Sequence, residues 1–439
     1  MQQNQNAVAR VADQPSSEKP FGGSPGAAKT GNQTHVVDQL LLGGMLESLG
    51  NPPLKIVLWD GREVAGAGKE PITARPMRLL IRDRSALMRL IADPEINFGE
   101  MFVAGRIEVQ GDLAEFLEMI YRALPRCKPP GFRERILATL IGKQRNTPKK
   151  AARNIYHHYD IGNDFYKLWL DEQMVYTCAY FPDPTLSLES AQVAKMDYVC
   201  RKLHLEPGES VVEAGCGWGA LALHMARNYG VSVKAYNLSR EQIAYARARA
   251  KIEGLQAKVE FIEGDYREIN NKFDAFVSVG MLEHVGISDY SGLGTIMARC
   301  LSQSGRGLIH TIGRDFPHGL NAWIERYIFP GACPPSLSQM MTMFEPHGFS
   351  ILDVENLRLH YAKTIEHWSQ RFEKTADQVT AQFDPAFVRA WRLYLAGSLA
   401  AFRSGDMQLF QVVFSRAGCN CIPWSRHDLY APGVTNGDM

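Results

Sequence analysis

The stretch from Val211 to Gly219 constrains this 439-residue chain more than any other. An apolar run leads directly into Gly-Cys-Gly-Trp-Gly and then into 220–228, where apolar residues recur with helical spacing. Gly215 and Gly217 permit a sharp turn and let the backbone approach a ligand, while the following helix offers free N–H groups. The Gly-x-Gly-x-Gly spacing favours a nucleotide-like cofactor without a pyrophosphate. A tight connection with no ligand is the alternative interpretation.

Further apolar runs indicate that this turn belongs to a larger sheet. They alternate with helical patterns, which predicts an α/β fold with a doubly wound parallel sheet. In such a sheet, ligands bind at the carboxyl ends of the strands. The expected strands, besides 210–214, are 231–236, 259–262, 273–279, one ending at 310–313, and 351–356.

Polar residues follow two of these strands. Ser239 and Gln242 open a helix with a Ser-x-x-Gln capping pattern, at a strand end suited to a ribose or a methionine tail. Asp265 follows the next strand and can accept a hydrogen bond from an adenine amino group. A plain helix cap for Gln242 and a solvated turn for Asp265 are the alternatives.

Composition restricts the partners of the chain. A net charge of +1 gives no general attraction to nucleic acid, so none is expected as a partner. Eight cysteines without a Cys-x-x-Cys pair, and no secretory signal, indicate reduced thiols in the cytoplasm. Cys419 and Cys421 alone supply too few ligands for a metal, so no metal site is predicted. No apolar run approaches the ~18 residues that span a bilayer, so a lipid would be met at the membrane surface.

The chain changes character several times along its length, and its size predicts more than one domain. Residues 128–153 hold eight basic residues and one acidic residue, with apolar positions at helical spacing. This segment is suited to docking on anionic phospholipid, and a solvated linker is an equal alternative. The expected parts are a disordered tail (1–36), a small α+β domain (37–125), a basic linker (126–153), a main domain (154–416) and a C-terminal tail (417–439).

Three chemically active residues are expected near one another. Glu283, His310 and Tyr361 all come after strands of the predicted sheet. Because such strand ends meet at one edge, these side chains could face a shared pocket. A helix expected at 383–403 could line a tunnel for an acyl chain or belong to the ordinary core.

Seven motifs in a fixed order carry a resemblance to a known family. Over residues 154–416 the chain resembles the cyclopropane-fatty-acyl-phospholipid synthases and the mycolic acid cyclopropane synthases, and 37–125 is similar to the small lipid-binding-protein-like N-terminal domain of the bacterial phospholipid enzymes. Glu213 and Asn237 depart from the Asp and Thr that are common there. The motifs are HHYDIGNDFY, VYTCAYF, EAGCGWG, NLSREQ, GMLEHVG, HTIG and LFQVVFSR.

The resemblance implies a fold, an activity and a cofactor. The expected fold class is α/β, a Rossmann-like class I S-adenosylmethionine-dependent methyltransferase domain with a smaller α+β N-terminal domain. The expected activity is cyclopropanation of unsaturated acyl chains in membrane phospholipids, with S-adenosylmethionine as methyl donor. The implied cofactor-binding residues are Tyr176, Thr177, Gly215, Gly217, Asn237, Ser239, Gln242, Asp265, Tyr266 and Arg267.

The resemblance also implies a bound bicarbonate. Its expected holders are Cys178, Glu283, His310, Ile312 and Tyr361. Hydrogen bonds from His310, Tyr361 and the Ile312 backbone N–H, with Glu283 accepting the bicarbonate hydroxyl, would fix this base near the substrate.

Two other functions stay open at this point. One is methyl or methylene addition to unsaturated phospholipid acyl chains without ring closure, and the other is a non-catalytic lipid-binding protein. The intact Glu283, His310 and Tyr361 argue against the second. A cytoplasmic protein associated with the inner face of the membrane, and possibly a homodimer, is expected.

Overall fold

A computed structural model describes residues 34–66, 68, 77–124, 161–420 and 423–430 of the chain. The basic segment 128–153, residues 1–33 of the expected N-terminal tail, and residues 421–422 and 431–439 of the expected C-terminal tail lie outside these residues.

The chain forms two compact units, each assembled from separate stretches of sequence. This division differs from the consecutive ranges expected from the sequence, because parts of the expected main domain belong to the first unit. The first unit comprises 1–143, 319–330 and 365–406, and the second comprises 144–318, 331–364 and 407–439.

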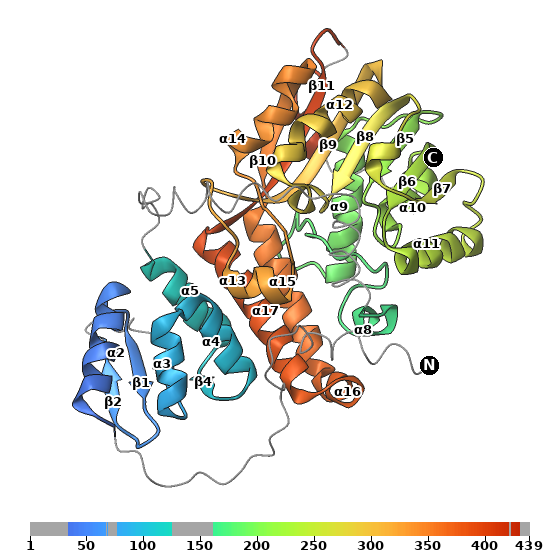
Figure 1. The fold of residues 1–439 in the computed structure, drawn as a ribbon. Coiled ribbons are helices and arrows are strands. Elements are labelled where there is room, and N and C mark those ends of the chain that lie inside the picture. The colour runs from blue at the N-terminus through green and yellow to red at the C-terminus, as the bar shows by residue number, and fades with distance from the viewer. Residues whose placement is uncertain (1–33, 67, 69–76, 125–160, 421–422, 431–439) are drawn as a thin grey trace. The chain divides into compact units, whose positions relative to one another are not determined.

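The second unit is built on a seven-stranded sheet in the order β10-β11-β9-β8-β5-β6-β7 (Figure 1). The five strands from β9 to β7 are parallel, and β11 runs antiparallel to both of its neighbours. The chain order reverses between β5 and β8, which is where open α/β sheets form their ligand crevice. The strands are β5 Ser210–Ala214, β6 Ser232–Asn237, β7 Val259–Glu263, β8 Phe273–Val279, β9 Leu301–Arg314, β10 Phe349–Asn356 and β11 Met407–Arg416.

Successive apolar residues of these strands pack into two separate hydrophobic cores, one on each face of the sheet. On β5, Val211 joins one core while Val212 and Ala214 join the other, as the two-residue period of a strand requires. Helices α9 to α11 pack into the first core and α12 into the second. The helices of this unit are α8 Asn163–Lys167, α9 Leu188–Lys202, α10 Ala220–Asn228, α11 Arg240–Ile252, α12 Tyr290–Cys300, α14 Leu337–Met340 and α18 His427–Tyr430, with short 3₁₀ turns η1 Tyr266–Glu268, η2 Leu282–His284, η3 Ile287–Asp289, η4 Met341–Met343 and η5 Glu345–His347.

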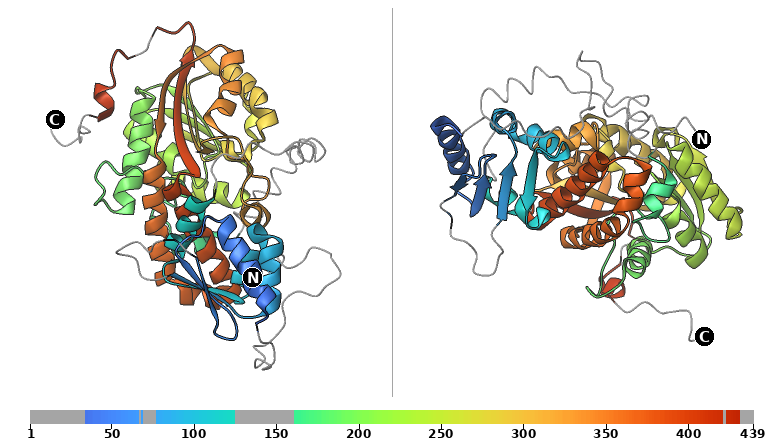
Figure 2. Two further views of the ribbon diagram at one scale, coloured as in Figure 1. Left: turned by 90° about the vertical axis from the view of Figure 1, so that its left-hand side faces the viewer. Right: turned by 90° about the horizontal axis from the view of Figure 1, so that it is seen from below.

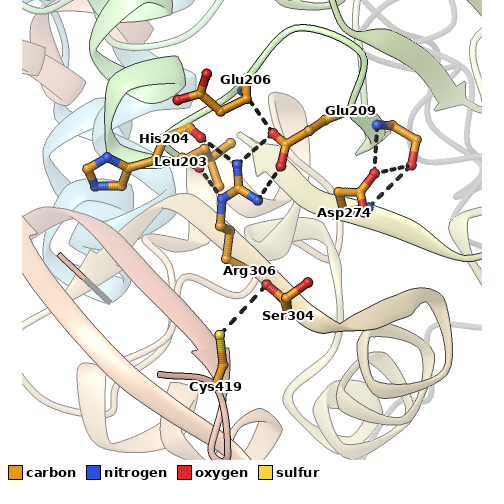
Figure 3. A network of polar contacts seen from close by, with 9 residues as sticks. Leu203, His204, Glu206, Glu209, Asp274, Ser304, Arg306 and Cys419 are labelled. Carbon is orange, nitrogen blue, oxygen red and sulfur yellow. Dashed lines mark hydrogen bonds and ion pairs between the residues drawn. The ribbon is translucent and has the colours of Figure 1, made fainter. Parts of the chain in front are cut away.

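Arg306 on β9 ties the C-terminal end of α9 to the start of β5 (Figure 3). Its guanidinium donates to the carbonyl oxygens of Leu203 and His204, and to both carboxylate oxygens of Glu209 at 2.8 and 2.6 Å. A cation at a helix C-terminus also complements the helix dipole. The network therefore fixes the end of the sheet opposite to the glycine turn.

The first unit contains a smaller sheet in the order β2-β1-β3-β4. β1 and β3 are parallel, and the other pairs are antiparallel. Helices α2, α3, α4 and α5 accompany it, so the unit is α+β in character. The elements are α2 Val36–Ser48, β1 Leu54–Val57, β2 Glu63–Ala65, β3 Met77–Ile81, α3 Arg84–Ala92, α4 Pro94–Val103, β4 Ile107–Gln110 and α5 Leu113–Ala123.

Three helices from the second half of the chain complete the first unit: α13 Ala322–Tyr327, α16 Ala376–Gln382 and α17 Pro385–Ser404. The residues of α15 (Arg358–Lys374) are divided between the two units, with the change at Ile365. Figure 2 gives two further views of these elements.

The helix expected at 383–403 is α17, and its bounds have local causes. Asp384 accepts from the Phe387 backbone N–H, Pro385 occupies the first turn, and Gly405 ends the helix in a left-handed conformation. The helix packs against α5 and α4. Arg389 secures this packing, since its guanidinium donates to the Phe102 carbonyl at 2.6 Å. α17 is thus part of the first unit, and its role as the wall of an acyl tunnel stays a prediction. Among the described helices, none combines the length and apolarity needed to cross a bilayer.

Candidate active site

A pocket opens at the carboxyl ends of β5 and β8, beside the glycine turn. Gly215, Gly217 and Gly219 all adopt positive φ, at 86°, 53° and 85°. A side chain at Gly215 would collide with Met281, at 2.9 Å, and one at Gly219 would meet Phe261 at 2.6 Å. No atom of the described residues lies within 4 Å of the corresponding position at Gly217. The two outer glycines therefore permit close packing, and the middle one leaves open space for a ligand.

Six of the ten predicted cofactor-binding residues line this pocket, on three separate segments. Asn237 connects two of these segments, because its side-chain nitrogen donates to Gln242 Oε1 at 2.7 Å and to the Gly217 carbonyl at 3.4 Å. The six are Tyr176, Thr177, Gly215, Gly217, Asn237 and Gln242.

The other four predicted residues, Ser239, Asp265, Tyr266 and Arg267, are not in the pocket lining. Ser239 accepts from the Gln242 backbone N–H at 3.4 Å and caps α11. Asp265 pairs with Arg267 at 2.8 Å and accepts from its backbone N–H. The Arg267 guanidinium lies 5.0 Å from the centre of the Tyr266 ring. Direct cofactor binding by these four residues stays a prediction.

The sequence analysis missed Lys195, which lies in the pocket wall on α9. Its side chain is buried, and Nζ donates to Thr177 Oγ1 at 3.0 Å. Burial lowers the pKa of Lys195 to about 8, and nearby acidic groups oppose that shift. A signal was present, since Lys195 continues the i, i+3, i+7 stripe of Leu188 and Ala191, both of which are buried.

Glu213 at the end of β5 faces the same pocket as Lys195. Burial raises the pKa of Glu213 to about 8, and the positive charge of Lys195 opposes this shift. Among the described residues, Glu213 Oε2 has no hydrogen-bond partner. The pocket therefore presents a buried carboxyl group and a buried amine to a polar ligand.

Replacing Lys195 with Met should raise the pKa of Glu213 above its value of about 8, because the substitution removes the positive charge that lowers this pKa. The carboxyl should then stay protonated to a higher pH. Carbon NMR of glutamate-labelled protein, with Glu213→Gln to identify the signal, measures the shift. An unchanged Glu213 titration in Lys195→Met would show that the two groups do not interact.

The segment that carries Tyr176, Thr177 and Cys178 is held in place from two sides. Gln192 on α9 donates to the Thr177 carbonyl at 2.9 Å. A side chain at Gly280 would lie 2.8 Å from Thr177 Cγ2, so the segment is in close contact with the end of β8. The pocket and the strand that precedes Glu283 therefore share a wall.

Glu283, in η2 after β8, is buried and hydrogen-bonded. The Thr311 hydroxyl donates to its Oε2 at 2.8 Å. Burial raises the pKa of Glu283 to about 7, while the Thr311 hydroxyl and the Ile312 backbone N–H act in the opposite direction. A carboxyl with a pKa near neutrality is suited to proton exchange.

His310 lies on β9 and is buried at 1% exposure. Its Nδ1 is 2.9 Å from the side-chain nitrogen of Gln411 on β11. Within the described residues, His310 Nε2 has no hydrogen-bond partner. The His310 carbonyl accepts from the Gly280 backbone N–H at 2.9 Å, which brings this strand to the glycine in contact with Thr177.

Cys178 and Tyr361 come from segments that contact each other. The Ala179 backbone N–H, next to Cys178, donates to Thr364 Oγ1 at 3.0 Å. Thr364 lies on α15, three residues after Tyr361. Cys178 is fully buried, and burial raises the pKa of its thiol, so it does not act as a thiolate. The five residues expected to hold an anion thus lie on segments that meet beside the cofactor pocket.

Comparison with known proteins identifies the family. The family model for mycolic acid cyclopropane synthetases matches residues 146–412, more than half of the chain. The chain belongs to this family. A second model, described only as a domain of unknown function, matches residues 41–125.

Several relatives of this cyclopropane synthetase family align along most of the chain. A probable fatty acid methyltransferase of Pseudomonas putida is 35% identical, over 86% of this chain and 96% of its own length. The cyclopropane-fatty-acyl-phospholipid synthase of Escherichia coli is 37% identical, over 78% and 88%. Mycolic acid cyclopropane synthase CmaA1, solved with SAH and CTAB, is 29% identical with a TM-score of 0.58, covering 60% of this chain and 98% of its own.

The family assignment confirms two expectations. The chain is an enzyme of the cyclopropane synthetase family, and its second unit has the α/β fold of class I S-adenosylmethionine-dependent methyltransferases. Coclaurine N-methyltransferase, at 21% identity and a TM-score of 0.60, shares that fold.

Proposed function

We propose that this enzyme converts the double bond of an unsaturated acyl chain in a membrane phospholipid to a cyclopropane ring. In this proposal S-adenosylmethionine is the methyl donor and bicarbonate is the base. The observation that supports it most directly is that the segments carrying Glu283, His310 and Tyr361 meet the segment of Thr177 and Cys178, beside a pocket lined by the glycine turn.

The pocket residues fit S-adenosylmethionine. This cofactor supplies a methyl group on a positively charged sulfur. Gly217 leaves room for the ligand to approach the backbone, and Glu213 offers a buried carboxyl oxygen without a partner among the described residues. Asn237 and Gln242, joined by a hydrogen bond, add further polar groups to the pocket lining. CmaA1, a family member, was solved with SAH.

The substrate step requires a dry, electron-rich environment. An alkene is a weak nucleophile, and its attack on the methyl group leaves a positive charge on the acyl chain. Aromatic rings stabilise such a cation through their faces. Tyr176 lies in the pocket wall, with its ring centre 5.4 Å from that of Tyr166 and 5.3 Å from that of Trp169. Phe181 and Tyr361 are buried on the neighbouring segments.

The anion-holding residues fit bicarbonate. It supplies the base that removes a proton from the transferred methyl group, which allows the ring to close. His310 Nε2 is a buried polar atom without a protein partner in the described chain, as a ligand site requires. His310 and the Tyr361 hydroxyl would donate to the anion, and Glu283 would accept its hydroxyl proton. A Glu283 pKa of about 7 suits such sharing of a proton near neutral pH.

Phospholipid as substrate, and peripheral association with the inner face of the membrane, are part of the proposal. They are supported by the named activity of the Escherichia coli relative and by the eight basic residues of segment 128–153.

A direct assay tests the proposal. The purified protein is incubated with S-adenosylmethionine, bicarbonate and vesicles of mono-unsaturated phospholipid, and the released fatty acids are analysed by mass spectrometry and proton NMR. We expect a mass gain of one CH₂, cyclopropane signals and loss of the olefin. Absence of both product and S-adenosylmethionine binding would instead indicate the non-catalytic lipid-binding alternative.

One alternative product is favoured by the comparisons. The Pseudomonas putida relative is described as a probable fatty acid methyltransferase, and a Mycobacterium tuberculosis relative, 33% identical, as a tuberculostearic acid methyltransferase. Here the same cation would lead to a methyl or methylene group without ring closure. Methyl or vinylidene signals in place of cyclopropane signals would support this alternative.

A further inference from the structure

His310 and Gln411 form a buried pair on neighbouring strands. The two residues face each other in the antiparallel register of β9 and β11, and they are 1% and 0% exposed. The Gln411 side-chain nitrogen lies 2.9 Å from His310 Nδ1. The other imidazole nitrogen, Nε2, lacks a hydrogen-bond partner among the described residues.

This geometry determines where the imidazole carries its proton. Burial lowers the pKa of His310 well below its usual value, so the ring is neutral and has a single N–H. In the amide orientation of this structure the Gln411 nitrogen faces Nδ1, and because an amide nitrogen donates but does not accept, Nδ1 is then the accepting nitrogen. The proton therefore resides on Nε2.

We infer that Gln411 is a positioning residue that fixes the Nε2–H tautomer of His310 and thereby makes this histidine a hydrogen-bond donor to an anion. The inference rests on the proposed function, in which bicarbonate lies beside His310 and Glu283. The opposite tautomer would direct a nitrogen lone pair at the oxygens of the anion. A charge-assisted hydrogen bond in a buried site contributes about 10- to 100-fold in affinity.

Packing alone does not account for Gln411. Its Oε1 atom is buried and has no partner in the described chain. The next two residues on β11, Val412 and Val413, are apolar and buried. An apolar side chain at position 411 would avoid burying an amide oxygen without a partner. The bond to His310 gives the amide a role that an apolar residue could not perform.

NMR tests the tautomer directly, without cofactor, bicarbonate or lipid. Protein labelled with ¹⁵N in its imidazole rings is compared with His310→Asn, which identifies the His310 signals. We expect a protonated Nε2 and an unprotonated Nδ1. The reverse assignment in the native protein would overturn the inference.

Two substitutions test the part played by Gln411. A carboxylate only accepts, so Gln411→Glu should draw the proton of His310 to Nδ1 and exchange the two signals when the spectrum is recorded at a pH high enough to ionise this buried carboxyl. Gln411→Met keeps a similar side-chain volume but favours neither tautomer of His310, so it should give a mixture of the two tautomers. Gln408→Met, on the same strand, removes a glutamine that accepts from Asn356 at 2.8 Å and should leave the His310 spectrum native. A native spectrum in both Gln411 variants would contradict the inference.

Turnover then connects the tautomer to the reaction. At saturating S-adenosylmethionine we expect kcat to fall about 100-fold in Gln411→Glu and about 10-fold in Gln411→Met, with a matching loss of apparent bicarbonate affinity. Cofactor affinity should stay unchanged, because Gln411 does not line the cofactor pocket. Full turnover in Gln411→Glu with exchanged NMR signals would overturn the role of the tautomer. If turnover of the native enzyme did not depend on bicarbonate concentration, the proposal that bicarbonate is the base would be refuted. The NMR result would still show which tautomer His310 adopts.

Discussion

Glu283→Gln is expected to lower kcat by about 100-fold or more, the range lost when a general acid–base group is removed. The amide cannot exchange a proton, although its oxygen can still accept from the Thr311 hydroxyl, which is 2.8 Å from the native carboxylate. The fold around η2 should therefore persist. Product formation at saturating S-adenosylmethionine and bicarbonate measures the effect.

Calorimetry of cofactor binding supplies the control for this substitution. Glu283 is not part of the pocket lining, so the Kd for S-adenosylmethionine should stay within about twofold of the native value, a difference well below 1 kcal/mol. Near-native turnover in Glu283→Gln would remove this residue from the mechanism. A lost cofactor affinity would show that the two sites are not separate.

Gly280→Ala is expected to weaken S-adenosylmethionine binding by about 10- to 100-fold and to reduce turnover with it. The new methyl group would lie 2.8 Å from Thr177 Cγ2, so Thr177 must shift, and this residue lines the pocket. The same glycine donates its backbone N–H to the His310 carbonyl. The displacement should therefore disturb the cofactor wall and the strand end together.

Gly254→Ala is a matched control for the backbone strain in this substitution. Both glycines have similar positive φ, 73° at Gly280 and 71° at Gly254, but no atom of the part of the chain that the structure describes lies within 4 Å of a side chain at position 254. Each variant should lose about 1–2 kcal/mol of stability from the left-handed conformation. Only Gly280→Ala should lose cofactor affinity. Equal Kd values in the two variants would contradict the proposed contact between Gly280 and the pocket wall.

The architecture of the second unit was largely predictable because its signals are local. The strand at 273–279 and the helix at 220–228 appear with the expected bounds, since the apolar periods are regular and the ends are marked by glycine or polar residues. The bounds of the two units were not predictable in this way. They depend on α17 packing against α4 and α5, which are more than 250 residues earlier in the chain.

The residues of the candidate site also fall into those marked by local sequence signals and those that depend on long-range packing. The glycine turn, Asn237 and Gln242 follow strands directly, so their position at the sheet edge could be expected. Lys195 was missed because it lies within a helix before the first sheet strand. Gln411 was missed because its role depends on the register between β9 and β11, which one sequence does not specify.

The fate of the transferred methyl group tests the central claim most directly. The enzyme is supplied with S-adenosylmethionine that carries three deuterons on this methyl group, and the fatty acid product is analysed by mass spectrometry and NMR. Ring closure requires removal of one of these deuterons as the second carbon–carbon bond forms. The account predicts a cyclopropane whose new ring carbon retains two deuterons, with no olefin left. A product that retains all three, as an intact methyl branch, would contradict it.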